Sequence, residues 1–422
     1  MKSGYQVTKL KNGVRIASIG MPHMQSATVG IWTAVGARHE SEALSGVSHF
    51  VEHLMFKGTK RRSSKQITEA VEGVGGYLNA YTTEDHTCYY AKAGASHLAT
   101  LCDVLGDMYL NSEFAPAEIE RERAVIREEI LMYRDQPAQY AQELLSATLW
   151  PDHALGRALT GTIETTSRLK RKDLMGHKQE TYNGRTTVVS VAGRVEHEEV
   201  VALMAPVLGK LPAGKEARFK RVSALQKAPR ISVHTQETEQ THLAMGFHAL
   251  GRQDERRFAL KLLSVILGEN MSSRLFQKLR EKHGLCYSVS SGMSMFEETG
   301  MLSIGMGLDP SNLQKALRLI FAELQRICKQ PPTKSELQKA QDYTIGQTLM
   351  GLESTSNHMM WIGDSILGYQ KILDPSSVER RLLAVTREEI GRVARECFDR
   401  ALCAIAVVGP VKGEDSIRAC LG

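Results

Sequence analysis

Two histidines and a glutamate lie close together near the start of the chain. His49, Glu52 and His53 form the pattern H-x-x-E-H within residues 46–59. If this segment is helical, the histidines at i and i+4 lie on one face, where two imidazoles can meet one tetrahedral zinc ion. Glu52 then lies beside that face and can reach a water at the metal. The segment therefore predicts a zinc site with a base beside it, provided that the rest of the chain supplies another ligand.

The residues around the histidines favour an amphipathic helix with one polar edge. Ser48 is a candidate N-cap for this helix. The positions expected to face a core are all apolar: Val47, Phe50, Val51, Leu54 and Met55. The alternative interpretation is an ordinary surface helix with two exposed histidines.

A second helical segment offers acids that could complete the site. It begins with Pro116 in its first turn, and its apolar positions face a core: Ile119, Val125, Ile126 and Ile130. Glu122 and Glu129 are seven residues apart, hence on one face, and either could supply an oxygen ligand. The spacing alone does not choose between Glu122, Glu128 and Glu129.

The composition is that of a globular protein with room for two domains. The chain has 422 residues, of which 42% are hydrophobic and 24% charged, and its net charge of +6 is spread along the sequence. We expect no nucleic-acid partner, because there is no basic stripe with interleaved aromatics. The seven cysteines form no C-x-x-C pair, which favours a reducing compartment and argues against cysteine-bound zinc. No apolar run approaches the ~18 residues of a membrane span, and no leader is recognisable, so we expect the cytoplasm of a bacterium.

The chain repeats itself at an offset of 216 residues. Gly30 matches Gly246 (246 − 30 = 216), and the segments 170–174 and 189–193 match 386–390 and 405–409 at the same offset. We therefore expect an α+β fold of two homologous domains. Each domain would be an α/β sandwich in which a mixed or antiparallel sheet has helices packed on one face.

The two copies should differ in their chemistry. The expected boundaries are an N-terminal metal-binding domain at 1–210, a basic linker at 211–229 and a C-terminal domain at 230–422. At the 216-residue offset, the H-x-x-E-H residues fall on positions that form no metal site: Val265, Gly268 and Glu269. We expect the second copy to hold substrate or a partner instead.

Three further features have weaker chemical meaning by themselves. The glycines at 73–76 follow a helix and open a strand, which is typical of a helix C-cap and not of a phosphate loop. The next strand, 77–83, carries polar side chains, and as an exposed edge it could pair with a peptide. Arg280 and Tyr287 would alone be read as a surface arginine and a half-buried tyrosine.

Together these motifs resemble the pitrilysin family of zinc peptidases, of the inverzincin type, and in particular mitochondrial processing peptidase and its bacterial homologues. Residues 49–59 are similar to the metal helix of that family. Residues 122–129 fit its E-R-x-V-I-x-x-E pattern, in which the ligand glutamate follows the second histidine by 76 residues (129 − 53 = 76). The resemblance implies that Glu129 is the third ligand of one zinc ion per chain. It also implies that Glu122 is an acid that contacts the ligand side chains and does not bind the metal itself.

The resemblance also implies the activity and its partners. The expected enzyme is a zinc metalloendopeptidase that cleaves peptides or unfolded segments in a closed chamber, with Glu52 as general base. Asn79 and Ala80 would pair with the substrate, and Arg280 and Tyr287 would hold its backbone, with Tyr287 also steadying the oxyanion. A homodimer with composite active sites, or a pairing with a paralogous subunit, is expected. The loop at 268–271 is short where the non-catalytic subunit of that family has a long glycine-rich loop, which argues against presequence recognition. The alternative is a non-catalytic scaffold of the same fold.

Overall fold

The structure is a computed structural model that describes residues 4–223 and 226–421. The chain divides into two compact units. Unit 1 is drawn from Met1–Ile130, Ala158–Lys220 and Leu349–Asp374, and unit 2 from Leu131–Arg157, Arg221–Thr348 and Pro375–Gly422. Each unit is therefore built from three separate stretches of sequence.

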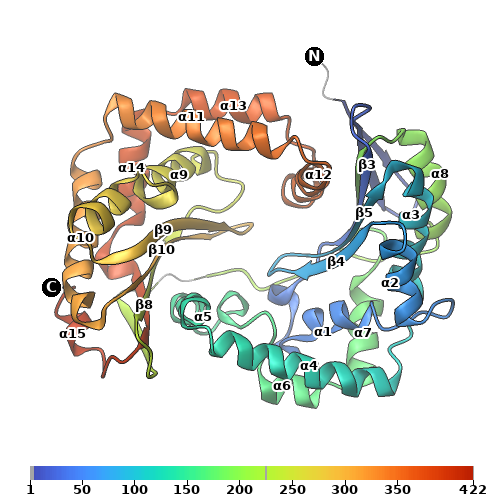
Figure 1. Cartoon of the computed structure of the whole chain (residues 1–422), viewed down its shortest axis with the longest axis horizontal. Coiled ribbons are helices and arrows are strands. Elements are labelled where there is room, and N and C mark those ends of the chain that lie inside the picture. Colours follow the sequence, from blue (N-terminus) through green and yellow to red (C-terminus); the bar gives the residue numbers. More distant parts are fainter. Residues whose placement is uncertain (1–3, 224–225, 422) are drawn as a thin grey trace. The chain divides into compact units, whose positions relative to one another are not determined.

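Unit 1 contains a six-stranded sheet in the order β1-β2-β6-β3-β5-β4. Strands β2 and β6 are parallel, and all other neighbours are antiparallel. Its strands are β1 (Tyr5–Lys9), β2 (Arg15–Gly20), β3 (Ser26–Thr33), β4 (Tyr77–Thr82), β5 (Thr87–Gly94) and β6 (Thr187–Gly193). Its helices are α1 (Val47–Leu54), α2 (Ser64–Glu72), α3 (Leu98–Asn111), α4 (Pro116–Arg134, whose last turn belongs to unit 2), α6 (Ile163–Arg168), α7 (Arg171–Thr181), α8 (His197–Leu208) and α12 (Thr355–Tyr369) (Figure 1).

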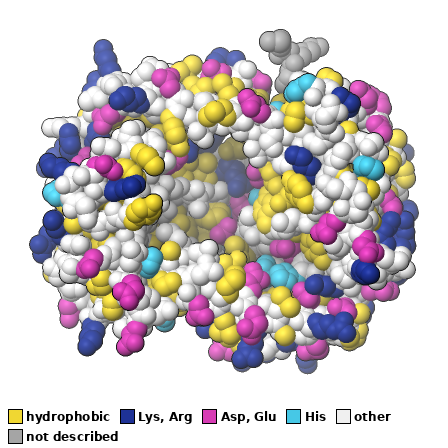
Figure 2. Space-filling view, in the orientation of Figure 1, with side chains coloured by type: hydrophobic (Ala, Val, Ile, Leu, Met, Phe, Trp, Pro, Cys, Tyr) yellow, Lys and Arg dark blue, Asp and Glu magenta, His cyan; other side chains and the backbone are white. Residues whose placement is uncertain are grey.

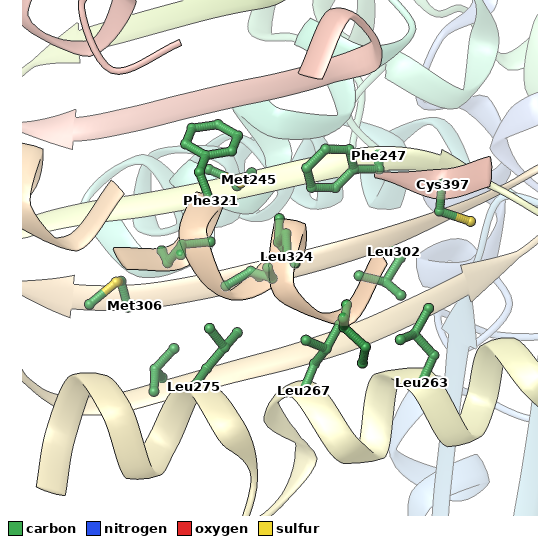
Figure 3. Packing of buried hydrophobic residues seen from close by; sticks show 14 of the residues in the cluster. Met245, Phe247, Leu263, Leu267, Leu275, Leu302, Met306, Phe321, Leu324 and Cys397 are labelled. Atoms are coloured by element: carbon green, nitrogen blue, oxygen red, sulfur yellow. The ribbon is translucent and has the colours of Figure 1, made fainter. Parts of the chain in front are cut away.

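Unit 2 contains a five-stranded sheet in the order β7-β11-β8-β10-β9. Its strands are β7 (Arg230–Thr235), β8 (Thr241–Ala249), β9 (Cys286–Met295), β10 (Gly300–Leu308) and β11 (Cys403–Gly409). Its helices are α5 (Pro137–Leu149), α9 (Arg257–Ser264), α10 (Leu313–Lys329), α11 (Lys334–Gly351, whose last turn belongs to unit 1), α13 (Pro375–Ala384), α14 (Arg387–Cys397) and α15 (Asp415–Arg418), with π-helical turns at Val265–Glu269 and Phe276–Lys282. Side chains of β8 and β10 pack against these helices, as Phe247 and Leu302 do in Figure 3.

The two sheets confirm the predicted duplication and fold class. Strands β6 and β11 occupy 187–193 and 403–409, an offset of 216 residues, and each is the parallel neighbour of β2 or β7. Beyond them, β3-β5-β4 repeats as β8-β10-β9, so β4 and β9 are corresponding edge strands. The buried strand residues alternate between two faces, and the larger helical layer covers one face of each sheet.

A single helix from the other half of the sequence covers the opposite face of each sheet. Met359, Ile362 and Ile366 of α12 pack against the sheet of unit 1, and α5 packs against the sheet of unit 2. The repeated glycines allow this approach. A Cβ on Gly30 would lie 2.4 Å from Met359 Sδ, and one on Gly246 would lie 3.2 Å from a methyl carbon of Leu145 in α5. Relative to the expected boundaries at 1–210, 211–229 and 230–422, unit 1 includes Leu349–Asp374 and unit 2 includes Leu131–Arg157, and the units divide between Lys220 and Arg221, inside the expected linker.

The surface mixes charges of both signs. On the face drawn in Figure 2, Lys and Arg side chains are interspersed with Asp and Glu. This agrees with a net charge of +6 that is spread along the chain. Within the described residues, no helix combines the length and the apolar character needed to cross a bilayer.

Candidate metal centre

Helix α1 is held at its start by a buried carboxylate and a glycine. Gly46, the N-cap, has φ +91°, and a Cβ there would lie 2.6 Å from the carbonyl oxygen of Thr160. The two oxygens of Glu40 accept hydrogen bonds from the backbone N–H groups of Gly46 and Ser48, both at 2.8 Å. A carboxylate at a helix N-terminus satisfies unpaired amides and complements the helix dipole. The predicted N-cap at Ser48 is therefore wrong, because the N-cap is Gly46, two residues earlier, and the Glu40 carboxylate satisfies the first amides.

Ser48 instead faces a buried histidine of α7. The Ser48 hydroxyl lies 3.2 Å from His177 Nε2. Burial, reinforced by the charge of His39, lowers the pKa of His177 to about 4. His177 is thus neutral at pH 7 and packs beneath the helix that carries the predicted metal ligands.

This buried histidine should make the fold sensitive to acid. The pKa in the unfolded chain is about 6.5, so the unfolded state takes up a proton first as the pH falls, and stability is lost between pH ~6.5 and ~4. We expect His177→Gln to lose about 2 kcal/mol less free energy of unfolding than the wild type between pH 7.5 and pH 5. Urea unfolding with chelator in both samples, so that metal release does not contribute, measures the difference. Equal losses in the two proteins would contradict it.

Three of the predicted residues converge on one point. The distance from His53 Nε2 to Glu129 Oε2 is 3.4 Å, and that from His49 Nε2 to the same oxygen is 3.6 Å. The two imidazole rings lie 4.6 Å apart between centroids. Ligand atoms about 2.1 Å from a tetrahedral ion are roughly 3.4 Å apart, so these spacings suit zinc. Among the described residues, this is the only group of three or more His, Cys, Asp or Glu side chains with ligand atoms close enough to share a metal ion.

The tertiary structure chooses between the acids of α4. Glu129 joins the histidines, Glu128 is exposed, and Glu122 is buried behind His53. Of the apolar positions expected to face the core from α4, Ile119, Ile126 and Ile130 are buried in the core of unit 1. The prediction for Val125 is wrong, because that side chain is 48% exposed.

Glu122 fixes the orientation of one predicted ligand. Its Oε2 lies 3.1 Å from His53 Nδ1, and its Oε1 lies 2.8 Å from the Lys57 ammonium. With Nδ1 engaged, Nε2 of His53 is the atom directed at Glu129. By contrast, His49 Nδ1 is buried without a hydrogen-bond partner in the described residues, so only packing and the contact of Nε2 with Glu129 orient that ring. Sequence reasoning missed Lys57, although its position four residues after His53 was a usable signal.

The electrostatics of the cluster favour a cation. Burial disfavours the charged form of His53, but hydrogen bonds to Glu122 and Glu129 outweigh it and raise the pKa to about 9. Burial likewise opposes ionisation of Glu129, but its bonds to His49 and His53 hold its pKa well below the usual range. Two carboxylates thus stabilise the protonated form of the His53 imidazole. The donor set and its charge both fit a divalent metal ion such as zinc.

Glu52 lies beside the ligands and is held by a strand. It is 9% exposed, and its Oε2 accepts a hydrogen bond of 2.7 Å from the hydroxyl of Thr82 at the end of β4. Sequence reasoning missed Thr82. No spacing rule relates it to Glu52, because the two residues meet only through the packing of α1 against β4.

The strand predicted to pair with a peptide is an edge strand. Strand β4 bonds to β5 alone within its sheet. The N–H of Ala80 donates 2.8 Å to the side-chain oxygen of Asn79, the preceding residue. Because its own neighbour satisfies this amide, a peptide pairing at Ala80 would have to replace the Asn79 side chain.

The two residues singled out in the second copy lie together in unit 2. The Arg280 guanidinium lies 5.0 Å from the ring centre of Tyr287 and 4.7 Å from that of Phe276. Tyr287 is 79% exposed at the start of β9. Its ring also borders a pocket of about 370 Å³ with polar residues of α5 and β8, among them Gln142 and His242.

A duplicated α+β fold whose first copy carries a His-His-Glu centre is the architecture of a metallohydrolase. Family models agree. Residues 15–163 match the model described as insulinase, peptidase family M16, and residues 168–343 match the peptidase M16 inactive domain. The second match covers most of the copy in which the sequence predicts no metal site.

Relatives of similar length show the same family. The chain is 36% identical to an uncharacterized zinc protease of Streptomyces coelicolor, over 97% of this chain and 91% of that protein. It is also 36% identical to the uncharacterized zinc protease YmxG of Bacillus subtilis, over 95% of this chain and 97% of that protein. The chain belongs to peptidase family M16. The predicted zinc peptidase class is confirmed at the level of this family.

Solved structures agree with the fold. A protease from Helicobacter pylori superposes with a TM-score of 0.90 at 23% identity, over 96% of this chain and 99% of that one. A peptidase M16 inactive domain from Pseudomonas fluorescens gives a TM-score of 0.89 at 19% identity, over 97% of this chain and 99% of that one. At these identities the likeness concerns the fold alone.

Proposed function

We propose that this protein is a zinc metalloendopeptidase that cleaves extended peptides or unfolded protein segments. The observation that carries the proposal is the convergence of His49, His53 and Glu129 beside the buried acid Glu52. Zinc, when bound by these three side chains, supplies a Lewis acid that lowers the pKa of a water molecule toward ~7. The rest of the chemistry belongs to the residues of the chain.

Glu52 is the proposed general base. It takes a proton from the attacking water and later delivers it to the leaving amine. Glu122 orients His53 through Nδ1, and Lys57 balances the charge of Glu122. Each of these groups occupies a buried or half-buried position, where electrostatic interactions are stronger than in water.

The substrate is proposed to bind as an added strand. The edge of β4 at Asn79 and Ala80 would pair with an extended peptide, whose carbonyl would replace the Asn79 side chain on the Ala80 amide. Arg280 and Tyr287 are proposed to hold the substrate backbone, and Tyr287 also to steady the oxyanion. The proposal also includes a closed chamber around the site and a homodimer or paralogous pair with composite active sites. The proposed location is the bacterial cytoplasm.

The proposal predicts that zinc and peptide hydrolysis go together. Purified protein should contain about one zinc per chain and should cleave a pool of mixed unstructured peptides. Treatment with a chelator should abolish cleavage, and added zinc should restore it. Metal analysis and mass spectrometry of the products measure both quantities.

The outcomes separate this proposal from a scaffold. A zinc-loaded protein that cleaves no peptide, alone or with a paralogous subunit added, would contradict the peptidase. A protein that binds no zinc at all would favour the non-catalytic scaffold. Retention of all three ligands and of Glu52 favours the enzyme.

A further inference from the structure

The hydroxyl of Thr82 is the nearest polar support of the proposed base. It donates 2.7 Å to Glu52 Oε2. Among the described residues, no other hydrogen bond reaches the Glu52 carboxylate. The terminal torsion of a glutamate is soft, with a broad and roughly two-fold distribution. Without a hydrogen-bond partner, the Glu52 carboxylate could rotate about this torsion, and neither oxygen would keep a fixed direction.

We propose that Thr82 is a positioning residue that holds one oxygen of Glu52 so that the other faces the attacking water. The proposal rests on the function proposed above, in which Glu52 is the base. Thr82 itself does not touch the reacting atoms. It acts through Glu52, in the way that an outer hydrogen bond orients a metal ligand.

The surroundings of Thr82 keep its proton available for Glu52. The Thr87 hydroxyl on β5 lies 3.4 Å from that of Thr82 but donates to the carbonyl of Val35 at 3.0 Å. Glu52, as a carboxylate, is acceptor-only. Thr82 is β-branched and lies in a strand, so its χ1 angle has little freedom. Its hydroxyl is therefore pre-set to donate to Glu52.

In the second copy of the fold, the corresponding contact between edge strand and helical turn has no Glu–Thr pair. There, Gly268 occupies the position of Glu52 at the 216-residue offset, and the edge strand β9 corresponds to β4. A Cβ on Gly268 would lie 2.6 Å from the backbone nitrogen of Ser291 on β9. Strand and helical turn are in direct contact, with no room for an acid. The hydroxyl of Ser291 would lie 2.9 Å from that Cβ, so the second copy has a strand hydroxyl here but no acid for it to hold.

The test compares Thr82→Val with Thr82→Ser. Valine keeps the shape and the strand propensity of threonine but removes the hydroxyl, whereas serine keeps the hydroxyl. We expect kcat for peptide cleavage to fall about tenfold in Thr82→Val, part of the 10²- to 10⁴-fold that a general base supplies. KM and zinc content should stay unchanged, and Thr82→Ser should recover most of the loss. Thr28→Val is the matched control, because Thr28 is a buried threonine of the same sheet whose hydroxyl bonds to Thr355 at 2.9 Å.

A second measurement is independent of activity. In crystal structures of zinc-free protein, the Glu52 carboxylate should keep its orientation in the wild type and in Thr82→Ser and lose it in Thr82→Val. An unchanged kcat in Thr82→Val, or a loss that serine does not restore, would overturn the proposal. If the wild type cleaves no peptide, the proposed function fails, and the orientation of Glu52 then decides alone whether Thr82 positions it.

Discussion

Glu52→Gln should lower kcat for peptide hydrolysis by at least about 10²-fold while zinc remains bound. Glutamine has the same size and can still accept the hydrogen bond from Thr82, but it cannot take a proton from water. The three ligand side chains are unchanged, so the metal content should equal that of the wild type. Steady-state hydrolysis of a single well-cleaved peptide, with zinc measured on the same sample, tests this expectation.

The matched control for this substitution is Glu42→Gln. Glu42 is an exposed glutamate in the short turn that precedes α1. It should lose neither zinc nor activity. Wild-type kcat in Glu52→Gln would show that another group is the base, and a variant that has lost its zinc would show that Glu52 acts on the metal site itself.

Glu129→Gln should weaken zinc binding by more than about 100-fold. Loss of an outer partner of a metal ligand typically costs 10- to 100-fold in affinity, and loss of the ligand charge itself should cost more. The carboxylate lies 3.4 Å from His53 and 3.6 Å from His49, and an amide gives up its negative charge. Competition with a chromophoric chelator at fixed pH measures the affinity, and peptide cleavage at limiting zinc should fall in parallel.

Glu128→Gln is the natural control, because it changes the adjacent residue of the same helix. Glu128 is exposed and lies outside the metal group. Its replacement should leave zinc affinity within a factor of about two. If Glu129→Gln bound zinc as tightly as the wild type, the third ligand would have to be sought elsewhere, first at Glu122, which lies behind His53.

Much of the fold could be anticipated because it depends on local pattern and on repetition. The helix at Pro116–Arg134 has proline in its first turn and apolar residues at helical spacing. The 216-residue offset predicted two homologous sheets, and β6 and β11 keep that offset. The exchange of α5 and α12 could not be anticipated. Periodicity shows that a helix has a buried face, but not which sheet covers it.

By itself, the sequence predicted the two histidines as metal ligands and the acid between them as the base. Their spacing of three and four residues acts within one helix, so local geometry places them on neighbouring positions. Resemblance added Glu129. Only the tertiary structure brought Glu129 rather than Glu128 to the histidines, and only it placed Thr82 against Glu52. These contacts join residues 30 to 80 positions apart, and the packing of α1 against α4 and β4, which no local pattern encodes, decides them.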